Sequence, residues 1–203
     1  MPEDLRAEEH PASGKRVIRE AVLAARSALS DADRATANAT LVAAAADLAR
    51  GRSCVAGYAP LPDEPGGSGL PAALAAVLPP YGLILPALQT DRDLDWVAYD
   101  GTLGAGAVLR VLREPPGPRL GPEAISRADL VFVPALAVDP TGGRLGRGGG
   151  SYDRALTRVR PGVAVVALLY PGEVVPAVPM QPHDRPVTAV LTPDGLVEVG
   201  GHD

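Results

Sequence analysis

The run Val163–Leu168 contains only apolar residues, and it constrains the fold more than any other feature of the sequence. A strand with one solvent-facing side alternates apolar and polar residues, whereas a strand without a polar side is covered on both faces. A second apolar run, Leu130–Val133, has the same character. Because helices cover both faces of such sheets, the pattern predicts an α/β protein.

Helical patterns alternate with these apolar runs along the chain. Apolar residues at helical spacing predict a helix from Ser13, its expected N-cap, to about Leu29, and Ser30 is expected to cap a second helix that ends at Gly51. Further strands are predicted at 53–58, 82–85, 95–99 and 187–191, and further helices at 71–78 and 152–159. We therefore predict a three-layer sandwich with a largely parallel or mixed central sheet flanked by helices.

The chain has 203 residues and is predicted to form a single α/β domain over residues 13–199, preceded by a loose tail at residues 1–12. Hydrophobic residues make up 46% of the chain and charged residues 21%, which favours a folded core over disorder. The net charge of −5 and the aromatic content of 3% disfavour a nucleic-acid-binding protein. Phosphate contacts need a basic surface, and single-strand binding needs stacking side chains.

Cys54 is the only cysteine, which excludes an intramolecular disulfide and a cysteine-cluster metal site. The first 20 residues are rich in charged side chains and lack the apolar core of a signal peptide. No apolar run approaches the roughly 18 residues of a membrane span. We therefore expect a cytoplasmic protein without nucleic-acid or membrane partners, and the sequence leaves the oligomeric state open.

The segment Pro134–Ser151 is a long glycine-rich loop between a predicted strand and a predicted helix. In α/β proteins ligands bind at this place, beyond the carboxyl ends of the strands. The three consecutive glycines Gly148–Gly150 allow several backbone N–H groups to point at one anion, and Arg144 and Arg147 add positive charge. The standard motifs G-x-x-x-x-G-K-[ST] and G-x-G-x-x-G are both absent. We nevertheless favour phosphate binding over a flexible, solvated turn.

Three acids have two interpretations each. Asp153 lies in the first turn of the helix after the loop, where it either interacts with the helix dipole or holds Mg²⁺, and spacing alone favours neither. Asp139 belongs to a good turn sequence and is also a candidate metal ligand. Asp184 is plainly explained by a turn before the last strand, and alternatively by a metal carboxylate at that strand's end.

Lys15 is the only lysine among 19 basic residues, and it precedes Arg19 by four residues on the first predicted helix. The two side chains are therefore neighbours beside the apolar stripe of that helix. Cations in this position can point into a cleft, but a solvated pair at the rim of the packed face is the favoured interpretation.

Glu64 follows the first predicted strand, in the loop Tyr58–Glu64. Its carboxylate could accept two N–H groups of a heterocycle, although a solvated loop acid is favoured locally. No Ser/His/Asp or Cys/His triad is predicted, because two of the three histidines lie near the termini and the cysteine lies in an apolar strand.

The glycine-rich segment resembles the signature of the 5-formyltetrahydrofolate cyclo-ligases, also called 5,10-methenyltetrahydrofolate synthetases. The matching runs are Pro134–Asp139, Arg144–Gly150 and Tyr152–Asp153. The other clusters follow in the family's order over nearly the whole chain, from about residue 15 to residue 192. The Lys15/Arg19 pair looks like the family's ATP-contacting element, Asp63–Glu64 like its folate-contacting loop and Asp184 like its late metal carboxylate.

This resemblance implies a set of site residues but no protein nucleophile or base. ATP would be held by Lys15, Arg19, Arg144, Leu145, Gly146, Arg147, Gly148, Gly149, Gly150, Ser151 and Tyr152. The reduced folate would be held by Ala59, Glu64, Arg147 and Tyr152, and Mg²⁺ by Asp153 and Asp184.

The reaction so implied is the ATP- and Mg²⁺-dependent cyclisation of 5-formyltetrahydrofolate to 5,10-methenyltetrahydrofolate, with release of ADP and phosphate. It would be a ligase step of folate and one-carbon metabolism. Two departures from the family's pattern keep an alternative open, a non-catalytic nucleotide- or folate-binding relative of the same fold. Ser151 stands where many members have a tyrosine, and Ala87 where many have a basic residue.

Overall fold

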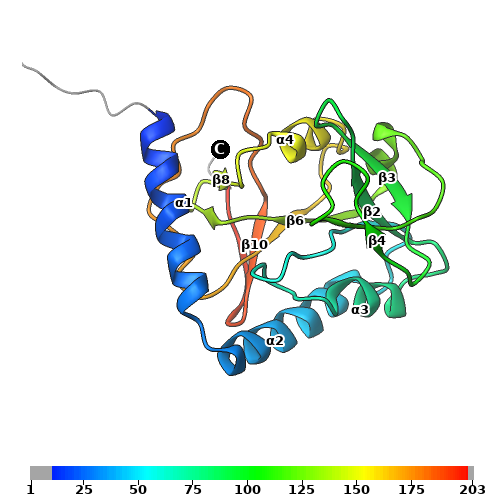
Figure 1. Cartoon of the computed structure of the whole chain (residues 1–203), viewed down its shortest axis with the longest axis horizontal. Helices are drawn as coiled ribbons and strands as arrows, with labels where there is room; N and C mark the ends of the chain where they lie inside the picture. Colours follow the sequence, from blue (N-terminus) through cyan, green and yellow to red (C-terminus); the bar gives the residue numbers. More distant parts are fainter. Residues whose placement is uncertain (1–10, 201–203) are drawn as a thin grey trace, which may run out of the picture.

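The computed structural model describes residues 11–200, which form one seven-stranded sheet with helices around it (Figure 1). The strand order is β11-β10-β9-β6-β1-β2-β3. In this order the strands span Gly195–Glu198, Ala189–Thr192, Val165–Leu168, Leu130–Pro134, Val55–Ala56, Leu83–Leu88 and Leu94–Ala98. The β2–β3 and β10–β11 pairs are antiparallel and the other neighbours are parallel. The predicted mixed central sheet is confirmed.

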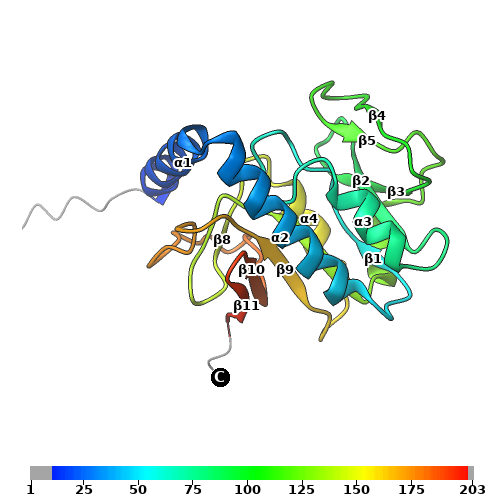
Figure 2. The same cartoon turned by 90° about the horizontal axis from the view of Figure 1, so that it is seen from below.

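Helices cover both faces of this sheet, which gives three layers (Figures 1 and 2). On one face lie α2 (Asp31–Ala49) and α3 (Leu70–Val77). The opposite face carries α4 (Ser151–Leu156) and the 3-10 helix η1 (Pro122–Arg127). In Figure 2 the pair α2 and α3 lies in front of the strands and α4 behind them. The predicted three-layer sandwich is therefore confirmed.

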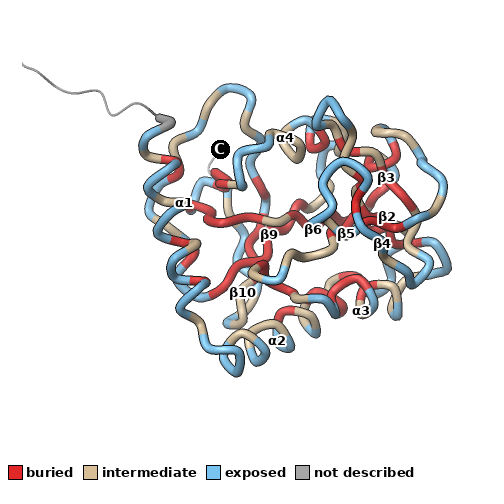
Figure 3. Tube along the Cα trace, viewed as in Figure 1, coloured by how far each residue is buried: buried red, intermediate tan, exposed pale blue. Residues whose placement is uncertain are grey.

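The β9 strand has the environment that its composition predicts. All four of its residues are buried, and Figure 3 shows it within the buried centre of the molecule. Val166 belongs to the hydrophobic cluster with Leu41 of α2, whereas Val165 belongs to the cluster with Ala155 of α4. The strand is thus covered on both faces, because a run without polar residues leaves neither face for water.

Two short hairpins lie outside the main sheet. The segment that we expected to be a loop at residues 134–151 contains β7 (Ala137–Val138) paired with β8 (Arg144–Leu145), so that expectation is wrong in part. The second hairpin consists of β4 (Gly104–Ala105) and β5 (Arg113–Glu114) and was not predicted. Strands of two residues are too short to show a periodicity.

The first helix, α1 (Pro11–Ala28), packs against the β7–β8 hairpin. Val22 of α1 shares a hydrophobic cluster with Leu136 and Leu145 at the two sides of the hairpin. The helix already includes residues 11 and 12, so the expected Ser13 cap and the expected tail boundary at residue 12 are wrong. The rest of the expected tail, residues 1–10, lies outside the described part of the chain.

The start of α2 agrees with its predicted capping residue, whereas α4 has no side-chain cap. The side chain of Ser30 accepts a hydrogen bond from the backbone N–H of Asp33 at 3.1 Å, so the predicted cap of α2 is confirmed. By contrast α4 starts from Gly150 without a side-chain cap and ends at Leu156, three residues before its predicted end. No helix within residues 11–200 is both long and apolar enough to cross a membrane.

Candidate active site

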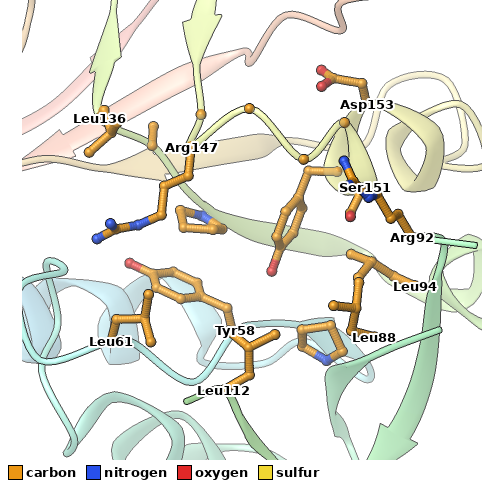
Figure 4. A pocket seen from close by; sticks show the side chains of 18 of the residues that line it. Tyr58, Leu61, Leu88, Arg92, Leu94, Leu112, Leu136, Arg147, Ser151 and Asp153 are labelled. Carbon is orange, nitrogen blue, oxygen red and sulfur yellow. The ribbon is translucent and has the colours of Figure 1, made fainter. Parts of the chain in front are cut away.

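A cavity of about 890 Å³ opens at the carboxyl ends of β1, β2 and β6, where the sandwich architecture predicts a ligand site (Figure 4). Its volume lies in the usual range for small-molecule sites, roughly 300–1,000 Å³. Its lining includes all of the site residues predicted from the sequence, namely Lys15, Arg19, Ala59, Glu64, Arg144, Leu145, Gly146, Arg147, Gly148, Gly149, Gly150, Ser151, Tyr152, Asp153 and Asp184. The fold thus brings together four segments that are far apart in the sequence.

Lys15 and Arg19 form one side of the cavity, so the favoured interpretation of a solvated rim pair is wrong. Only 9% of Lys15 is exposed, and its Nζ lies 2.5 Å from Oδ2 of Asp184. The Nε of Arg19 donates to the carbonyl oxygen of Gly146 at 2.9 Å. Burial alone would raise the pKa of Asp184, but Lys15 and the backbone N–H of Gln181 hold it below its usual value.

Arg144 and Asp153 form a second ion pair in the lining, with Nη2 of Arg144 2.7 Å from Oδ1 of Asp153. The same oxygen accepts the backbone N–H of Arg185 at 3.2 Å, which joins the α4 side of the cavity to the segment that carries Asp184. The Nε of Arg144 is buried and has no hydrogen-bond partner within the described residues. Two carboxylates, each next to a cation, therefore lie at neighbouring positions of one wall.

Arg147 connects the glycine-rich loop to the loop after β1. Its Nε donates to Oε1 of Glu64 at 2.9 Å, and its Nη2 donates to both carboxylate oxygens of Asp63 at 2.7 Å. Burial opposes the charged forms, yet the Arg147 guanidinium holds the pKa of Asp63 below its usual value, and the two acids raise the pKa of Arg147. In Figure 4 the side chain of Arg147 extends from the loop toward Tyr58 and Leu61.

Glu64 is therefore not the solvated loop acid that local sequence favours. It is 6% exposed, and its second carboxylate oxygen accepts the backbone N–H of Leu61 at 3.0 Å. A buried carboxylate keeps its charge only with partners, and here the loop amide and Arg147 supply them. Hydrogen-bond donors of a ligand could replace Arg147 at this carboxylate.

Gly148 of the glycine-rich loop lies beside the side chain of Arg19. This residue has φ +97°, a left-handed backbone conformation that residues other than glycine rarely adopt. A Cβ atom at this position would lie 3.7 Å from the guanidinium of Arg19. The helix that follows has only six residues, so its dipole is short. An anion at this wall would therefore depend on the surrounding cations more than on a helix dipole.

Tyr152 presents an unsatisfied polar atom in the same lining. Its hydroxyl is buried without a hydrogen-bond partner in residues 11–200. Burial raises the pKa of Tyr152 above its usual value, and the carboxylate of Glu64 raises it further, so the phenol is neutral. A buried hydroxyl without a partner costs free energy unless a ligand or water completes it.

Asp139 holds a turn and lies outside the cavity lining. Its Oδ1 accepts the backbone N–H groups of Thr141 and Gly143 and the hydroxyl of Thr141, and its Oδ2 accepts the N–H of Val178. Burial alone would raise its pKa, but these donors hold the pKa of Asp139 below its usual value. Of the two interpretations, the turn residue is supported, because both oxygens are occupied by the protein.

Several lining residues were not singled out in the sequence. They lie on the β2–β3 turn and the β4–β5 hairpin and comprise Leu88, Arg92, Leu94, Val108, Leu109, Leu112, Arg113 and Glu114. Nothing in the local sequence marks them as cavity residues. Polar turns and two-residue strands are common in most sequences and are too short to show a periodic pattern. Ala87, where a basic residue was expected from the resemblance, is fully buried in β2 and does not line the cavity.

Comparison with known proteins agrees with this architecture over most of the chain. The model of the 5-formyltetrahydrofolate cyclo-ligase family matches residues 11–193. A 5-formyltetrahydrofolate cyclo-ligase from Mycolicibacterium smegmatis is 42% identical over 147 residues, which cover 68% of this chain and 73% of that protein. One from Mus musculus is 40% identical over 80 residues, which cover 36% of this chain and 38% of that protein.

Solved structures give the same result. The NMR structure of Aquifex aeolicus 5,10-methenyltetrahydrofolate synthetase superimposes with a TM-score of 0.72 at 28% sequence identity, covering 93% of this chain and 94% of that chain. A 5,10-methenyltetrahydrofolate synthetase from Mycoplasma pneumoniae has a TM-score of 0.69 at 15% identity, covering 88% and 98%, and shows the shared fold.

Proposed function

The chain belongs to the 5-formyltetrahydrofolate cyclo-ligase family, and from this premise we propose that it closes 5-formyltetrahydrofolate to 5,10-methenyltetrahydrofolate. The reaction consumes ATP in the presence of Mg²⁺ and releases ADP and phosphate. The observation that carries the proposal is the convergence of Lys15, Glu64, the glycine-rich loop and Asp184 on one cavity. A protein that bound its ligand through only one of these segments would not need all four segments to line the same cavity.

The phosphates of ATP are assigned to the wall formed by Lys15, Arg19, Arg144 and the glycine-rich loop. Phosphoryl transfer is catalysed mainly by positioning and by neutralisation of charge, which these cations and the loop amides supply. Lys15 contributes a compact charge, and arginine side chains contribute planar donors that suit phosphate oxygens. The pairing of Lys15 with Asp184 and of Arg144 with Asp153 holds these cations in place before a ligand arrives.

The carboxylates of Asp153 and Asp184 fit a Mg²⁺ ion that also contacts substrate phosphates. Mg²⁺ in such sites uses one or two carboxylates and completes its shell with phosphate oxygens and water. Each acid keeps one oxygen without a hydrogen bond from the described residues, Oδ2 of Asp153 and Oδ1 of Asp184. No group of three or more His, Cys, Asp or Glu residues suited to a metal occurs within residues 11–200, which argues against a dedicated all-protein cage. When bound, Mg²⁺ would neutralise charge on the transferred phosphoryl group.

The reduced folate is assigned to the side of the cavity with Ala59, Glu64, Arg147 and Tyr152. The carboxylate of Glu64 has the right chemistry for the adjacent N–H groups of a pterin ring, because an ionised carboxylate accepts two parallel hydrogen bonds. In this structure Arg147 donates to one carboxylate oxygen of Glu64 and also to Asp63. Arg147 can therefore stay bound to Asp63 when a ligand replaces it at Glu64. The hydroxyl of Tyr152, which has no hydrogen-bond partner within residues 11–200, is available to the ligand.

The proposed chemistry needs no nucleophile or base from the protein. The formyl oxygen of the folate attacks the γ-phosphorus, and the bond from that phosphorus to ADP breaks. N10 then attacks the activated formyl carbon and loses its proton, and the bond from that carbon to the phosphate oxygen breaks. The residues of this chain hold the two substrates in line, stabilise the charge that develops on the phosphoryl group and exclude water.

The test is a spectrophotometric assay with purified protein, 5-formyltetrahydrofolate, Mg²⁺ and ATP. We expect the absorbance of methenyltetrahydrofolate to rise only when ATP is present. ATP-induced thermal stabilisation without any product would instead support a non-catalytic binding relative. Absence of ATP-dependent product at every protein concentration would contradict the proposed function.

A further inference from the structure

The loop that carries Glu64 into the cavity is held by two side chains outside the cavity lining, Tyr170 and Asn38. Tyr170 follows β9 and is 2% exposed, and its hydroxyl lies 3.2 Å from the carbonyl oxygen of Glu64 and 2.9 Å from Oδ1 of Asn38. Asn38 belongs to α2, and the same Oδ1 accepts the backbone N–H of Gly66 at 2.9 Å. With either acceptor for its proton, Tyr170 is therefore linked to the segment 64–66.

The position of Tyr170 is itself fixed by a buried ion pair. Oε2 of Glu173 accepts the backbone N–H of Tyr170 at 2.9 Å, and Glu173 also accepts two hydrogen bonds from Arg26, at 2.6 and 2.8 Å. The guanidinium of Arg26 lies over the ring of Tyr170, 5.6 Å from its centroid, which is a cation–π contact. Burial raises the pKa of Tyr170 above its usual value, so the phenol is neutral and can donate.

The other hydrogen bonds of Glu64 do not attach the loop to the rest of the fold. The backbone N–H of Glu64 donates to the carbonyl oxygen of Leu61 at 2.9 Å, and its carboxylate accepts the N–H of Leu61 at 3.0 Å, so both bonds stay within the loop. The bond from Arg147 is the one that a ligand would replace. Once that bond is lost, the place of the carboxylate depends on how the loop backbone is held.

A third hydroxyl holds the same loop but belongs to the cavity. Tyr58 donates to the carbonyl oxygen of Pro65 at 2.7 Å, and it lines the cavity, where Figure 4 shows its ring. A change at Tyr58 would therefore alter the contact surface and the loop together. A change at the hydroxyl of Tyr170 alters only the support of the loop.

We propose that Tyr170 is a positioning residue for folate recognition, whose hydroxyl holds the backbone at Glu64 so that the carboxylate is aligned with the ring N–H groups of the folate. This role rests on the proposed function, which places the folate at Glu64. Two parallel hydrogen bonds to one carboxylate need a fixed direction of approach, and they weaken steeply when the acceptor turns away. Loss of the support should therefore weaken folate binding and leave ATP binding unchanged.

The first test is Tyr170→Phe, which removes the hydroxyl and keeps the ring on Arg26. We expect the Kd of 5-formyltetrahydrofolate, measured by calorimetry without ATP, to rise about three- to tenfold, the usual effect of losing one hydrogen bond. The Kd of ATP should not change. Unchanged folate affinity in Tyr170→Phe, or an equal loss of affinity for both ligands, would overturn the assigned role.

A double-mutant cycle with Glu64→Gln shows whether Tyr170 acts through the carboxylate. We expect Glu64→Gln alone to weaken folate binding about tenfold, because a charge-assisted hydrogen bond is lost. In the Glu64→Gln background, Tyr170→Phe should then change the Kd by less than twofold. The same fold-change in both backgrounds, or full folate affinity in Glu64→Gln, would contradict a role through Glu64.

The matched control is Thr188→Val, which removes a structural hydroxyl outside the cavity lining. The hydroxyl of Thr188 accepts the backbone N–H of Val165 at 2.9 Å and donates to the carbonyl oxygen of Val165 at 3.2 Å. We expect this variant to lose thermal stability and to bind folate like the wild type. If Thr188→Val weakened folate binding as much as Tyr170→Phe, general loss of stability would explain both and the positioning role would be refuted.

These titrations require no turnover, so their outcome is separate from that of the proposed function. A non-additive cycle in a protein that binds the folate but forms no methenyltetrahydrofolate would contradict the function and support the role of Tyr170. An active enzyme in which Tyr170→Phe raises the KM for 5-formyltetrahydrofolate equally with and without Glu64 would contradict that role and leave the function intact.

Discussion

Lys15 is the only lysine of a chain with 18 arginines, and the fold places its ammonium group in the cavity beside Asp184. A guanidinium at the same position would be larger and planar, whereas the ammonium is a compact charge that can approach a phosphate oxygen and a carboxylate together. The one lysine of the chain therefore lies at a position where a compact charge fits the cavity better than a guanidinium.

We predict that Lys15→Ala weakens ATP binding about tenfold or more and leaves the fold intact, because one charge-assisted contact is lost. Lys15→Arg should restore only part of the affinity. Nucleotide titration and circular dichroism of the three proteins measure this. Unchanged ATP dependence in Lys15→Ala would return Lys15 to the status of a packing residue.

At the same scale, Asp139 is predicted to serve stability and not metal binding. In Asp139→Asn an NH₂ group replaces one of the two carboxylate oxygens. This NH₂ group faces either the N–H groups of Thr141 and Gly143 or the N–H of Val178, so a hydrogen bond becomes a repulsive contact between donors. We expect a loss of about 1.5–3 kcal/mol in the free energy of unfolding at pH 7.

The loss should depend on pH in a definite direction. The folded-state pKa of Asp139 lies below its usual value, so its contribution is complete above the unfolded-state pKa and disappears as the pH falls through the lower folded-state pKa. Urea unfolding of both proteins at pH 7 and near pH 3 measures the difference. An equal difference at both pH values would show that the carboxylate charge is not the cause.

Among the elements, α1 and the β7–β8 hairpin position most of the cations. Arg26 of α1 is buried, donates to Glu173 at 2.6 and 2.8 Å and to the carbonyl oxygen of Ala135 at 2.8 Å, and so fixes the helix against the end of β6. This attachment orients the helix face that carries Lys15 and Arg19. A rotation of α1 by one residue, about 100°, would turn both away from the cavity.

The hairpin itself depends on a close backbone approach at Gly142. Its carbonyl oxygen accepts the N–H of Val187 at 2.9 Å, and a Cβ atom at position 142 would overlap the carbonyl oxygen of Val187. Gly142 has φ +85° and Gly172 has φ +83°, but a Cβ atom at position 172 meets nothing within 4 Å.

We therefore predict that Gly172→Ala costs about 1–2 kcal/mol of unfolding free energy from backbone strain alone. Gly142→Ala should cost about 1–3 kcal/mol more, because it adds the steric overlap. Thermal or urea unfolding of the pair tests this. Equal losses in the two variants would mean that the contact with Val187 relaxes without cost.

For the whole molecule, the sequence was sufficient for the layers of the fold and for one group of the residues that line the cavity. Apolar runs such as Val163–Leu168 and the Ser30 cap are local signals, and the structure agrees with both. What could not be predicted is pairing over long distances. Lys15 and its partner Asp184 are 169 residues apart in the sequence, and Arg147 and its partner Glu64 are 83 residues apart. Local sequence therefore favoured a solvated side chain for both Lys15 and Glu64.

The lining residues on the β2–β3 turn and the β4–β5 hairpin were missed for a related reason. They lie on a turn and a two-residue strand, where no period is visible, and their meaning comes only from the cavity that they share. Short elements and long-range pairs are decided by tertiary packing, and local pattern carries little information on either.

In the proposed reaction the γ-phosphoryl group of ATP moves to the formyl oxygen of the folate within one cavity. The most direct test uses 5-formyltetrahydrofolate whose formyl oxygen is ¹⁸O, with ATP and Mg²⁺, and analyses the phosphate released. We predict that one ¹⁸O atom enters inorganic phosphate for each methenyltetrahydrofolate formed, because that oxygen leaves with the phosphoryl group. Product accompanied by unlabelled phosphate, with the label found in water, would contradict the account.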